Sequence, residues 1–400
     1  MVEWIEKSLG EIAEVTKLAG FEFTKHIKYN SDGEIIALRA LNLRNGELDL
    51  TDIKRISREV SERLTRSKIY KDDILLTYTG NGYGDCAIIE DNDKYHLAPN
   101  ICKIVPNNKE VFPYYLYCYI RSKAFYNQMS NNMTGSGQPT IPMKTIRLLK
   151  VPVPEMSVQI NVANMIWLLN QKIRNNRAIN NNLEQQAQAL YRKMFIENAN
   201  PEWSEGTISD LGIVVGGSTP SKAKPEYYTQ HGIAWITPKD LSLNKSKFIT
   251  RGENDISELG LRNSSATIMP KGTVLFSSRA PIGYIAIAAG DVTTNQGFKS
   301  IVPKSEIGTA FIYYFLKNAL PTIERMASGS TFKEISGSTM KSVPAFIPNN
   351  EALAKFNEFC TPIFEQQQLL ESQNQHLSQM RDTLLPKLIS GELDVSDIEL

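Results

Sequence analysis

Four short loops carry the side chains of this sequence that are best suited to chemistry. They are rich in glycine and small polar residues. Arg, Asn, Gln, Ser and Thr side chains contact base edges and phosphates, and the backbone amides of Gly-Ser turns can hold a phosphate. Each loop alone also fits an ordinary surface turn. The loops are Thr79–Gly84 (TGNGYG), Thr134–Thr140 (TGSGQPT), Ser278–Gly283 (SRAPIG) and Ser328–Lys333 (SGSTFK).

The sequence lacks the common motifs of catalytic sites. It contains no GxxxxGK[ST] loop, no HExxH helix and no GxSxG turn. It also contains no Asn-Pro-Pro or Asp-Pro-Pro tripeptide, which would hold a target amine in an amino-methyltransferase. No Pro-Asp dipeptide starts the usual carboxylate set of a nuclease. We therefore predict that this chain contributes no catalytic residue.

The cysteines and histidines do not have the spacing of metal ligands. None of the four cysteines forms a CxxC pair, and all lie in apolar runs, so we predict buried free thiols in a reducing compartment. The four histidines are scattered, and we predict no metal site. These residues are Cys86, Cys102, Cys118, Cys360, His26, His96, His231 and His376.

Composition narrows the class of protein. A chain of 400 residues with 42% hydrophobic and 22% charged residues is expected to form two or three globular domains. No apolar run approaches the ~18 residues of a membrane span, and the first residues do not resemble a signal peptide. We therefore expect a cytoplasmic protein without a membrane partner. The net charge of +1 is low for a free-standing DNA-binding domain, unless partners share the phosphate contacts.

The sequence repeats itself once along its length. Glu3-Trp4 recurs as Glu202-Trp203, and residues 72–88 (DDILLTYTGNGYGDCAI) align with residues 271–287 (KGTVLFSSRAPIGYIAI) at the same offset. ALRALNL (37–43) similarly aligns with WITPKDL (235–241). Chance similarity would not keep a nearly constant offset over such a length, and the period is much longer than that of a solenoid repeat. The chain therefore contains two copies of one unit.

Each copy is expected to begin with an α+β domain. Short runs rich in β-branched and aromatic residues, bounded by Gly, Asn, Asp or Pro, predict strands. Longer runs with apolar residues at helical spacing predict a helix over Phe112–Met129 and another over Thr309–Met326. The predicted strands are Ile35–Leu43, Ile74–Tyr78, Cys86–Ile89, Ile101–Val105, Thr273–Phe276, Ile285–Ala289 and Ser300–Val302.

Each copy ends in a long polar helix with a narrow apolar seam. The seam residues recur at steps of four and three, from Val162 to Met194 and from Phe356 to Leu388, with polar residues in the middle. Such a seam covers little more than one partner helix, so we predict that the two helices pair with each other rather than only with their own domains. Asn180 and Asn374 are then predicted to set the register, unless they are exposed at a kink. We expect Pro362 to kink the second helix near its start, and Pro386 to end or bend it.

At this point the chain resembles the specificity subunits of Type I restriction-modification systems. The segment RDTLLPKLISGEL (381–393) is similar to the C-terminal helix end of that family. The segments GSGQPTI (135–141), followed by VPVP (151–154), and GSTFKEI (329–335), followed by FIP (346–348), resemble the junction between domain and helix. The second copy departs from the pattern, because Phe332 stands where the first has Gln138. We therefore do not transfer a base-reading role between these two positions.

The resemblance implies a fold and a domain organisation. The fold would be two duplicated α+β target recognition domains, each followed by a long helix, with the helices pairing as an antiparallel coiled coil under pseudo-twofold symmetry. The expected boundaries are residues 1–154 for the first target recognition domain and 155–198 for the central spacer helix. Residues 199–348 would form the second target recognition domain, and 349–400 the C-terminal spacer helix and tail.

The resemblance also implies a non-catalytic role in DNA recognition. The chain would read the two halves of an asymmetric site in double-stranded DNA and would bind no cofactor itself. Two modification subunits would carry S-adenosylmethionine, and restriction or translocase subunits would use ATP and Mg²⁺. The polar loops would then contact DNA, with no metal. The residues predicted to do so are Arg39, Thr79, Asn81, Tyr83, Ser136, Gln138, Lys239, Ser278, Arg279, Ser330, Thr331 and Lys333.

Two other classes of function remain open at this stage. A DNA-modifying enzyme with an unrecognised motif would bind S-adenosylmethionine as an isolated chain. A coiled-coil adaptor that binds only protein would show no sequence-specific DNA binding in any assembly.

Overall fold

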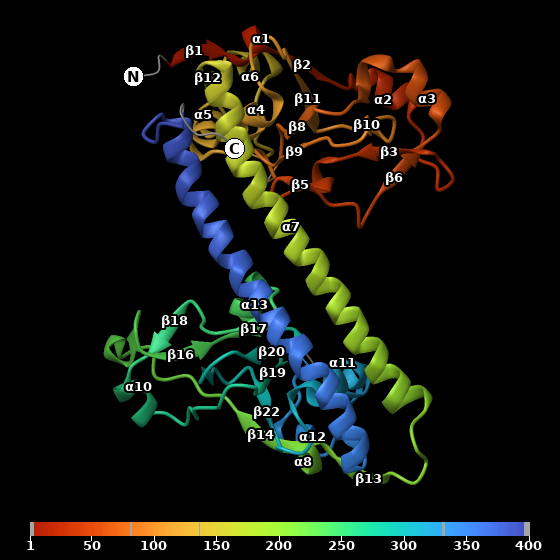
Figure 1. Cartoon of the computed structure of the whole chain (residues 1–400), viewed down its shortest axis with the longest axis vertical. Coiled ribbons are helices and arrows are strands. Elements are labelled where there is room, and N and C mark those ends of the chain that lie inside the picture. The colour runs from red at the N-terminus through yellow and green to blue at the C-terminus, as the bar shows by residue number, and fades with distance from the viewer. Residues whose placement is uncertain (1–3, 81, 136, 330–332, 396–400) are drawn as a thin grey trace. The chain divides into compact units, whose positions relative to one another are not determined.

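The chain folds into two compact units (Figure 1). The computed structural model describes residues 4–80, 82–135, 137–329 and 333–395. The first unit is Met1–Ile173 together with His376–Leu400, and the second is Arg174–Gln375. Each unit therefore combines one α+β domain with one stretch of each long helix.

The first unit contains two four-stranded sheets. One has the order β2-β11-β8-β9 and the other β6-β3-β10-β7, and two strand pairs, β1-β12 and β4-β5, complete it. The strands are β1 (Ile5–Ser8), β2 (Ala13–Lys17), β3 (Ile35–Leu38), β4 (Leu43–Arg44), β5 (Glu47–Leu48), β6 (Lys54–Ile56), β7 (Lys68–Ile69), β8 (Ile74–Thr77), β9 (Cys86–Ile88), β10 (Tyr95–Leu97), β11 (Ile101–Pro106) and β12 (Lys150–Val153). The helices of its domain are α1 (Leu9–Ile12), α2 (Gly20–His26), α3 (Arg58–Arg63), α4 (Pro113–Ile120), α5 (Lys123–Asn131) and α6 (Met143–Leu148).

The second unit repeats this topology. Its sheets have the orders β14-β22-β19-β20-β17 and β15-β18-β16-β21, with β13-β23 as the separate pair. Its strands are β13 (Ser204–Thr207), β14 (Gly212–Gly216), β15 (Tyr228–Thr229), β16 (Ile233–Ile236), β17 (Phe248–Ile249), β18 (Asn254–Ile256), β19 (Val274–Ser278), β20 (Ile282–Ala288), β21 (Thr293–Thr294), β22 (Lys299–Pro303) and β23 (Pro344–Ile347). The helices of its domain are α8 (Ile208–Leu211), α9 (Pro238–Leu243), α10 (Glu258–Arg262), α11 (Thr309–Met326) and α12 (Gly337–Lys341).

The strand pairings confirm the duplication. In the first unit β2 pairs antiparallel with β11, and in the second β14 pairs antiparallel with β22. The parallel pair of β3 and β10 likewise has its counterpart in β16 and β21. The predicted α+β class is therefore confirmed, since both copies combine helices with sheets that share these strand pairings.

One helix prediction was wrong, because two helices stand in place of one. The predicted helix Phe112–Met129 is two helices, α4 and α5, separated at Arg121 and Ser122. Ser122 has extended backbone angles, and its hydroxyl accepts a hydrogen bond from the amide of Phe125. Serine favours this N-cap position because its side chain replaces a missing helical hydrogen bond. The corresponding α11 is one helix with the predicted bounds, although Pro321 lies inside it.

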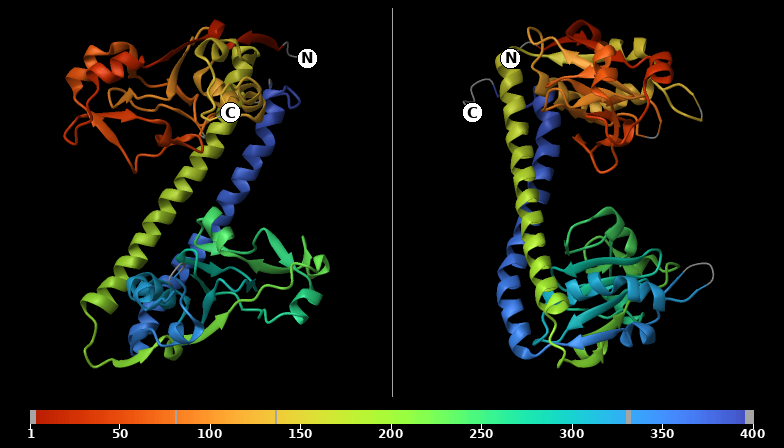
Figure 2. Two further views of the ribbon diagram at one scale, coloured as in Figure 1. Left: turned by 180° about the vertical axis from the view of Figure 1, so that it is seen from behind. Right: turned by 90° about the vertical axis from the view of Figure 1, so that its right-hand side faces the viewer.

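The two long helices run antiparallel to each other within each unit (Figure 2). They are α7 (Met156–Arg192), which continues as a π-helical turn over Lys193–Glu197, and α13 (Asn350–Ile389). In the first unit Asn161 of α7 donates to the carbonyl of Val395, and Asn170 accepts from Arg381 of α13. The predicted antiparallel pairing is confirmed, but the seam also packs on the domains. Val162 and Ile166 belong to the same apolar cluster as the β-sheet residues of the first unit.

The prediction that α13 could end at Pro386 is wrong, whereas a kink at Pro362 and a bend at Pro386 stay predictions. The helix is continuous through Pro362 and extends three residues past Pro386. Cys360 and Ile363, which flank Pro362 closely, are buried. Packing on both sides outweighs the helical hydrogen bond that a proline removes. Within the described ranges no helix, α7 and α13 included, is long and apolar enough to cross a membrane.

Candidate nucleic-acid interface

In the first unit the two glycine-rich loops are joined to each other. The amide of Gly80 donates to the carbonyl of Pro139 at 2.9 Å, and the hydroxyls of Thr79 and Thr140 are 2.6 Å apart. Thr134 and Thr140 exchange two backbone hydrogen bonds of 2.9 Å, which close the second loop at its base. Segments more than fifty residues apart in sequence therefore form one polar surface.

The second unit joins its loops in the same way. Arg279 and Glu334 form a backbone bridge, and Ser328 and Glu334 close the second loop with hydrogen bonds of 3.1 and 2.8 Å. One bond is repeated closely in both units: Ile141 donates to Tyr78 at 3.0 Å, and the aligned Ile335 donates to Ser278 at 3.1 Å. The loop pair is thus a duplicated structural element.

The residues predicted to contact DNA in the first unit have different surroundings. Gln138 is exposed, whereas Thr79 is buried against Thr140. The ring of Tyr83 stacks on Tyr126 with centroids 5.2 Å apart, and its hydroxyl accepts a hydrogen bond from the hydroxyl of Tyr126. Arg39 lies beyond the end of β3, where its guanidinium donates to the carbonyl of Asp52 at 2.7 Å. Asn81 and Ser136 lie outside the described residues.

In the second unit one prediction conflicts with the structure. Ser278 is the last residue of β19 and is fully buried, so its side chain is not placed to contact DNA. Arg279 is half-buried, with its guanidinium 3.4 Å from the carboxylate of Glu334, and Lys333 is exposed. Lys239 is exposed and forms an ion pair of 2.6 Å with Glu253. Ser330 and Thr331 lie outside the described residues.

A buried cation that was not predicted holds the second domain on the helix pair. The ammonium of Lys247, which precedes β17, is 2.8 Å from the carboxylate of Glu184 in α7 and 2.8 Å from the amide oxygen of Gln367 in α13. It also lies over the ring of Phe364, 3.5 Å from its centroid. One side chain of the domain therefore binds both long helices at once.

Backbone contacts extend this junction. The amides of Lys247 and Phe248 donate to the two carboxylate oxygens of Glu371, each at 3.0 Å. Asn180, one of the predicted register residues, donates to the same carboxylate at 3.4 Å. Asn374, the other one, is half-buried, and its amide oxygen has no hydrogen-bond partner among the described atoms. The predicted register role of both asparagines stays a prediction.

Electrostatics at this junction favour the charged pair. Burial alone would raise the pKa of Glu184, but the charges and hydrogen bonds of Lys247 and Lys317 outweigh it and lower that pKa to about 2. Burial lowers the pKa of Lys247 to about 8, against the opposing effect of Glu184. Burial also raises the pKa of Glu371, against the hydrogen bonds from the backbone of Lys247 and Phe248. Both groups of the pair are therefore charged between about pH 2 and about pH 8.

The first unit has a smaller junction of the same kind. The amide of Asn170 in α7 donates to the hydroxyl of Tyr114 in α4 at 3.0 Å. Its amide oxygen accepts from Arg381 of α13 at 3.2 Å. Each domain is thus tied to both helices of its unit by polar side chains, and this fixes the orientation of the loop pair on the helices.

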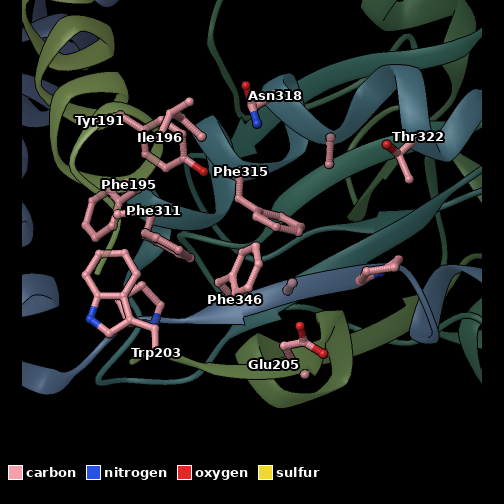
Figure 3. A pocket seen from close by; sticks show the side chains of 16 residues that line it. Tyr191, Phe195, Ile196, Trp203, Glu205, Phe311, Phe315, Asn318, Thr322 and Phe346 are labelled. Carbon is pink, nitrogen blue, oxygen red and sulfur yellow. The ribbon is translucent and has the colours of Figure 1, made fainter. Parts of the chain in front are cut away.

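An apolar cavity of about 540 Å³ lies elsewhere in the second unit (Figure 3). Aromatic side chains from the end of α7, from the π-helical turn after it and from α11 face the cavity, among them Tyr191, Phe195 and Phe311. The polar side chains in its lining are few, and such a lining suits apolar packing and not a phosphate.

The four cysteines are buried free thiols, as predicted. Burial raises the pKa of Cys86 to about 12, which keeps its thiol protonated and unreactive.

Comparison with known proteins agrees with this architecture. The family model described as "Type I restriction modification DNA specificity domain" matches residues 1–185 and again residues 200–379, one match for each copy. The specificity subunit of Type I restriction enzyme HindI from Haemophilus influenzae is 23% identical, over 98% of this chain and all of that protein. The specificity subunit of MjaIX from Methanocaldococcus jannaschii is 42% identical over 167 residues, which are 41% of this chain and only 38% of that protein.

A solved structure has the same fold. The crystal structure of a Type I restriction-modification S subunit from M. genitalium superimposes with a TM-score of 0.67 at 15% identity, over 97% of this chain and 96% of that one. The family model covers most of the sequence. The predicted role as a non-catalytic DNA-specificity subunit is therefore confirmed at the level of the family. The chain belongs to the family of Type I restriction modification DNA specificity domain proteins.

Proposed function

We propose that this chain is the subunit that selects the DNA target of a Type I restriction-modification assembly, and that it reads a bipartite, asymmetric site. Each α+β domain reads one half-site, and the paired helices separate the two domains. The observation that carries the proposal is the duplicated loop pair: both units join two polar, glycine-rich loops by equivalent bonds, Ile141 to Tyr78 and Ile335 to Ser278. The loops differ in sequence between the two units, so two domains with the same fold would bind two different half-sites.

We infer the partners from the family to which the chain belongs. Two modification subunits bind the chain and supply S-adenosylmethionine and the methylating residues, which this sequence lacks. Restriction or translocase subunits join them and use ATP and Mg²⁺. Exposed apolar side chains on the long helices support a docking role, since adjoining apolar side chains on a surface often mark a site of protein contact. In the first unit they are Trp167, Leu168 and Met380, and in the second Ile179, Phe359 and Leu369.

A reconstitution tests the proposal. The purified chain alone is expected neither to methylate nor to cut DNA. The chain combined with its modification subunits is expected to transfer methyl groups to one bipartite sequence, which sequencing of methylated bases in treated plasmid DNA would identify. Methyl transfer by the chain alone would show that the chain is itself a methyltransferase and would contradict the proposal. An assembly that methylates DNA without sequence preference, or a modification subunit that chooses the same site without this chain, would contradict the proposal.

A further inference from the structure

We propose that the second domain reads a base pair with a polar hollow beside its loop pair, and that Gln296 is the reading residue. The hollow has a volume of about 530 Å³ and lies between the loop that follows β14, the strands β16 and β18, and the loop that follows β21. Its exposed polar lining includes Lys222, Asn254 and Gln296. We call it the Gln296 hollow. The inference rests on the proposed function, and it specifies where in the second domain the half-site is read.

The walls of the Gln296 hollow are held rigidly. The hydroxyl of Tyr228 donates to the carbonyl of Pro220 at 2.6 Å, and the indole of Trp235 donates to the carbonyl of Ser218 at 3.0 Å. A Cβ atom at Gly217 would lie 1.9 Å from the carbonyl oxygen of Asn295, so only glycine allows the two loops to approach this closely. A site whose walls are already in place loses little entropy on binding.

The acidic groups of the Gln296 hollow are already engaged. The carboxylate of Asp240 accepts from the amide of Thr237 at 2.7 Å and from the amide of Glu253 at 2.9 Å. The carboxylate of Glu253 pairs with Lys239 at 2.6 Å. These groups therefore repel an anionic ligand less than free carboxylates would. The groups left to meet a ligand are amides and the ammonium of Lys222.

Gln296 has the hydrogen-bonding groups needed to read a base. Its amide oxygen accepts a hydrogen bond from the hydroxyl of Thr219, which orients the amide group. Among the described atoms no hydrogen bond occupies its amide nitrogen, and the oxygen keeps a second lone pair. A glutamine amide presented in this way pairs with the N7 and N6 atoms of adenine in the major groove. The ammonium of Lys222 is a point charge without a fixed arrangement of hydrogen-bond donors, so it suits a phosphate and not a base edge.

The Gln296 hollow adjoins the loop pair of the same unit. The amide of Ser278 donates to the carbonyl of Gly297 at 2.8 Å, directly beside Gln296. The ammonium of Lys299 is 3.5 Å from the carbonyl of Gln296 and 3.8 Å from the carboxylate of Glu334 in the second loop. Gln296 and the loop pair thus belong to one polar surface, and a duplex on that surface reaches both.

The test measures binding of the assembly, the full chain with its modification subunits, to a panel of duplexes. Each duplex carries the site that the wild-type assembly methylates, with one base pair changed. Gln296→Ala is expected to reduce discrimination roughly tenfold or more at one or two adjacent positions, all within one half-site, and to leave the other half-site unchanged. Lys222→Ala is expected to weaken binding to every duplex alike. It should also reduce the slope of log affinity against log salt concentration by about one.

Gln230→Ala serves as the matched control, because Gln230 is an exposed glutamine of the same domain outside the Gln296 hollow. It should change neither measurement. Thermal unfolding of each variant checks that the fold is intact. If Gln296→Ala weakens all duplexes equally, or leaves discrimination unchanged, the base-reading role is wrong while the proposed function stands. If the wild-type assembly itself discriminates no base pair, the proposed function fails first.

Discussion

Lys247 forms a buried polar contact between the second domain and both long helices, beside the apolar packing of the domain on them. Its ammonium is buried and contacts Glu184, Gln367 and the ring of Phe364. This contact could not be predicted from the sequence, because the partners are 63 and 120 residues away and a lysine in a polar stretch (LNKSKF) is typical of a solvated side chain. Of the predicted interface residues, by contrast, exposed Gln138 and Lys333 lie where a glycine-rich loop would place them.

Replacing Lys247 with methionine should destabilise the protein by about 2–4 kcal/mol, because it leaves the Glu184 carboxylate buried with Lys317 as its remaining cation. The free energy of unfolding in urea, followed by tryptophan fluorescence, measures the loss. Lys245→Met is the control, since Lys245 is exposed nearby and only covers the ring of Tyr284. It should cost less than about 1 kcal/mol. Equal losses for the two variants would show that the buried pair does not anchor the domain.

Glu184 predicts how stability depends on acidity. Its folded pKa of about 2 lies below the ordinary value of 4.5, so the stability it contributes is complete above about pH 4.5 and is lost as the pH falls toward 2. Glu184→Gln should be less stable than the wild type at pH 6, but its stability should fall less between pH 6 and pH 3. Urea unfolding at both pH values measures this difference. Glu365→Gln, a change at an exposed residue of α13, should keep the wild-type fall, and an identical fall in Glu184→Gln would exclude the mechanism.

At the scale of elements, most strands and the helices α7, α11 and α13 could be predicted, because their patterns of apolar residues are long and regular. The break between α4 and α5 could not, since it depends on one serine side chain that caps α5 inside a continuous helical pattern. The continuation of α13 past Pro386 was missed for a related reason: Leu388 and Ile389 pack in the apolar cluster of the first unit, and this packing outweighs local propensity.

The seam of the helix pair offers a direct test of what its polar residues do. Asn176 is fully buried, donates to Gln373 at 3.3 Å, and leaves its amide oxygen without a partner among the described atoms. Asn176→Leu should therefore raise the free energy of unfolding by about 1 kcal/mol relative to Asn175→Leu. Asn175 is exposed, so that control cancels the gain in helix propensity. A destabilised Asn176→Leu would mean that Asn176 makes the seam more stable and does not merely restrict its register.

At the scale of the whole molecule, the duplication was the strongest signal in the sequence, and both the repeated strand order and the two family matches confirm it. The bases that each domain reads could not be predicted. Hydrogen-bonding groups such as those of Gln138 and Gln296 can be placed in the fold. Which base edge faces each group depends on how the duplex lies against the domain, and the amino-acid sequence does not determine this by itself.

The central claim is that two copies of one domain read two half-sites independently, and a domain replacement tests it most directly. Residues 1–154 are exchanged for the matching domain of a relative with a different target, and the methylated sites are mapped by sequencing the genome of cells that carry the assembly. Each copy has its own loop pair and its own apolar core, so one half-site should change to that of the donor and the other should stay as it was. A simultaneous change of both half-sites, or an unchanged site with full activity, would contradict the account.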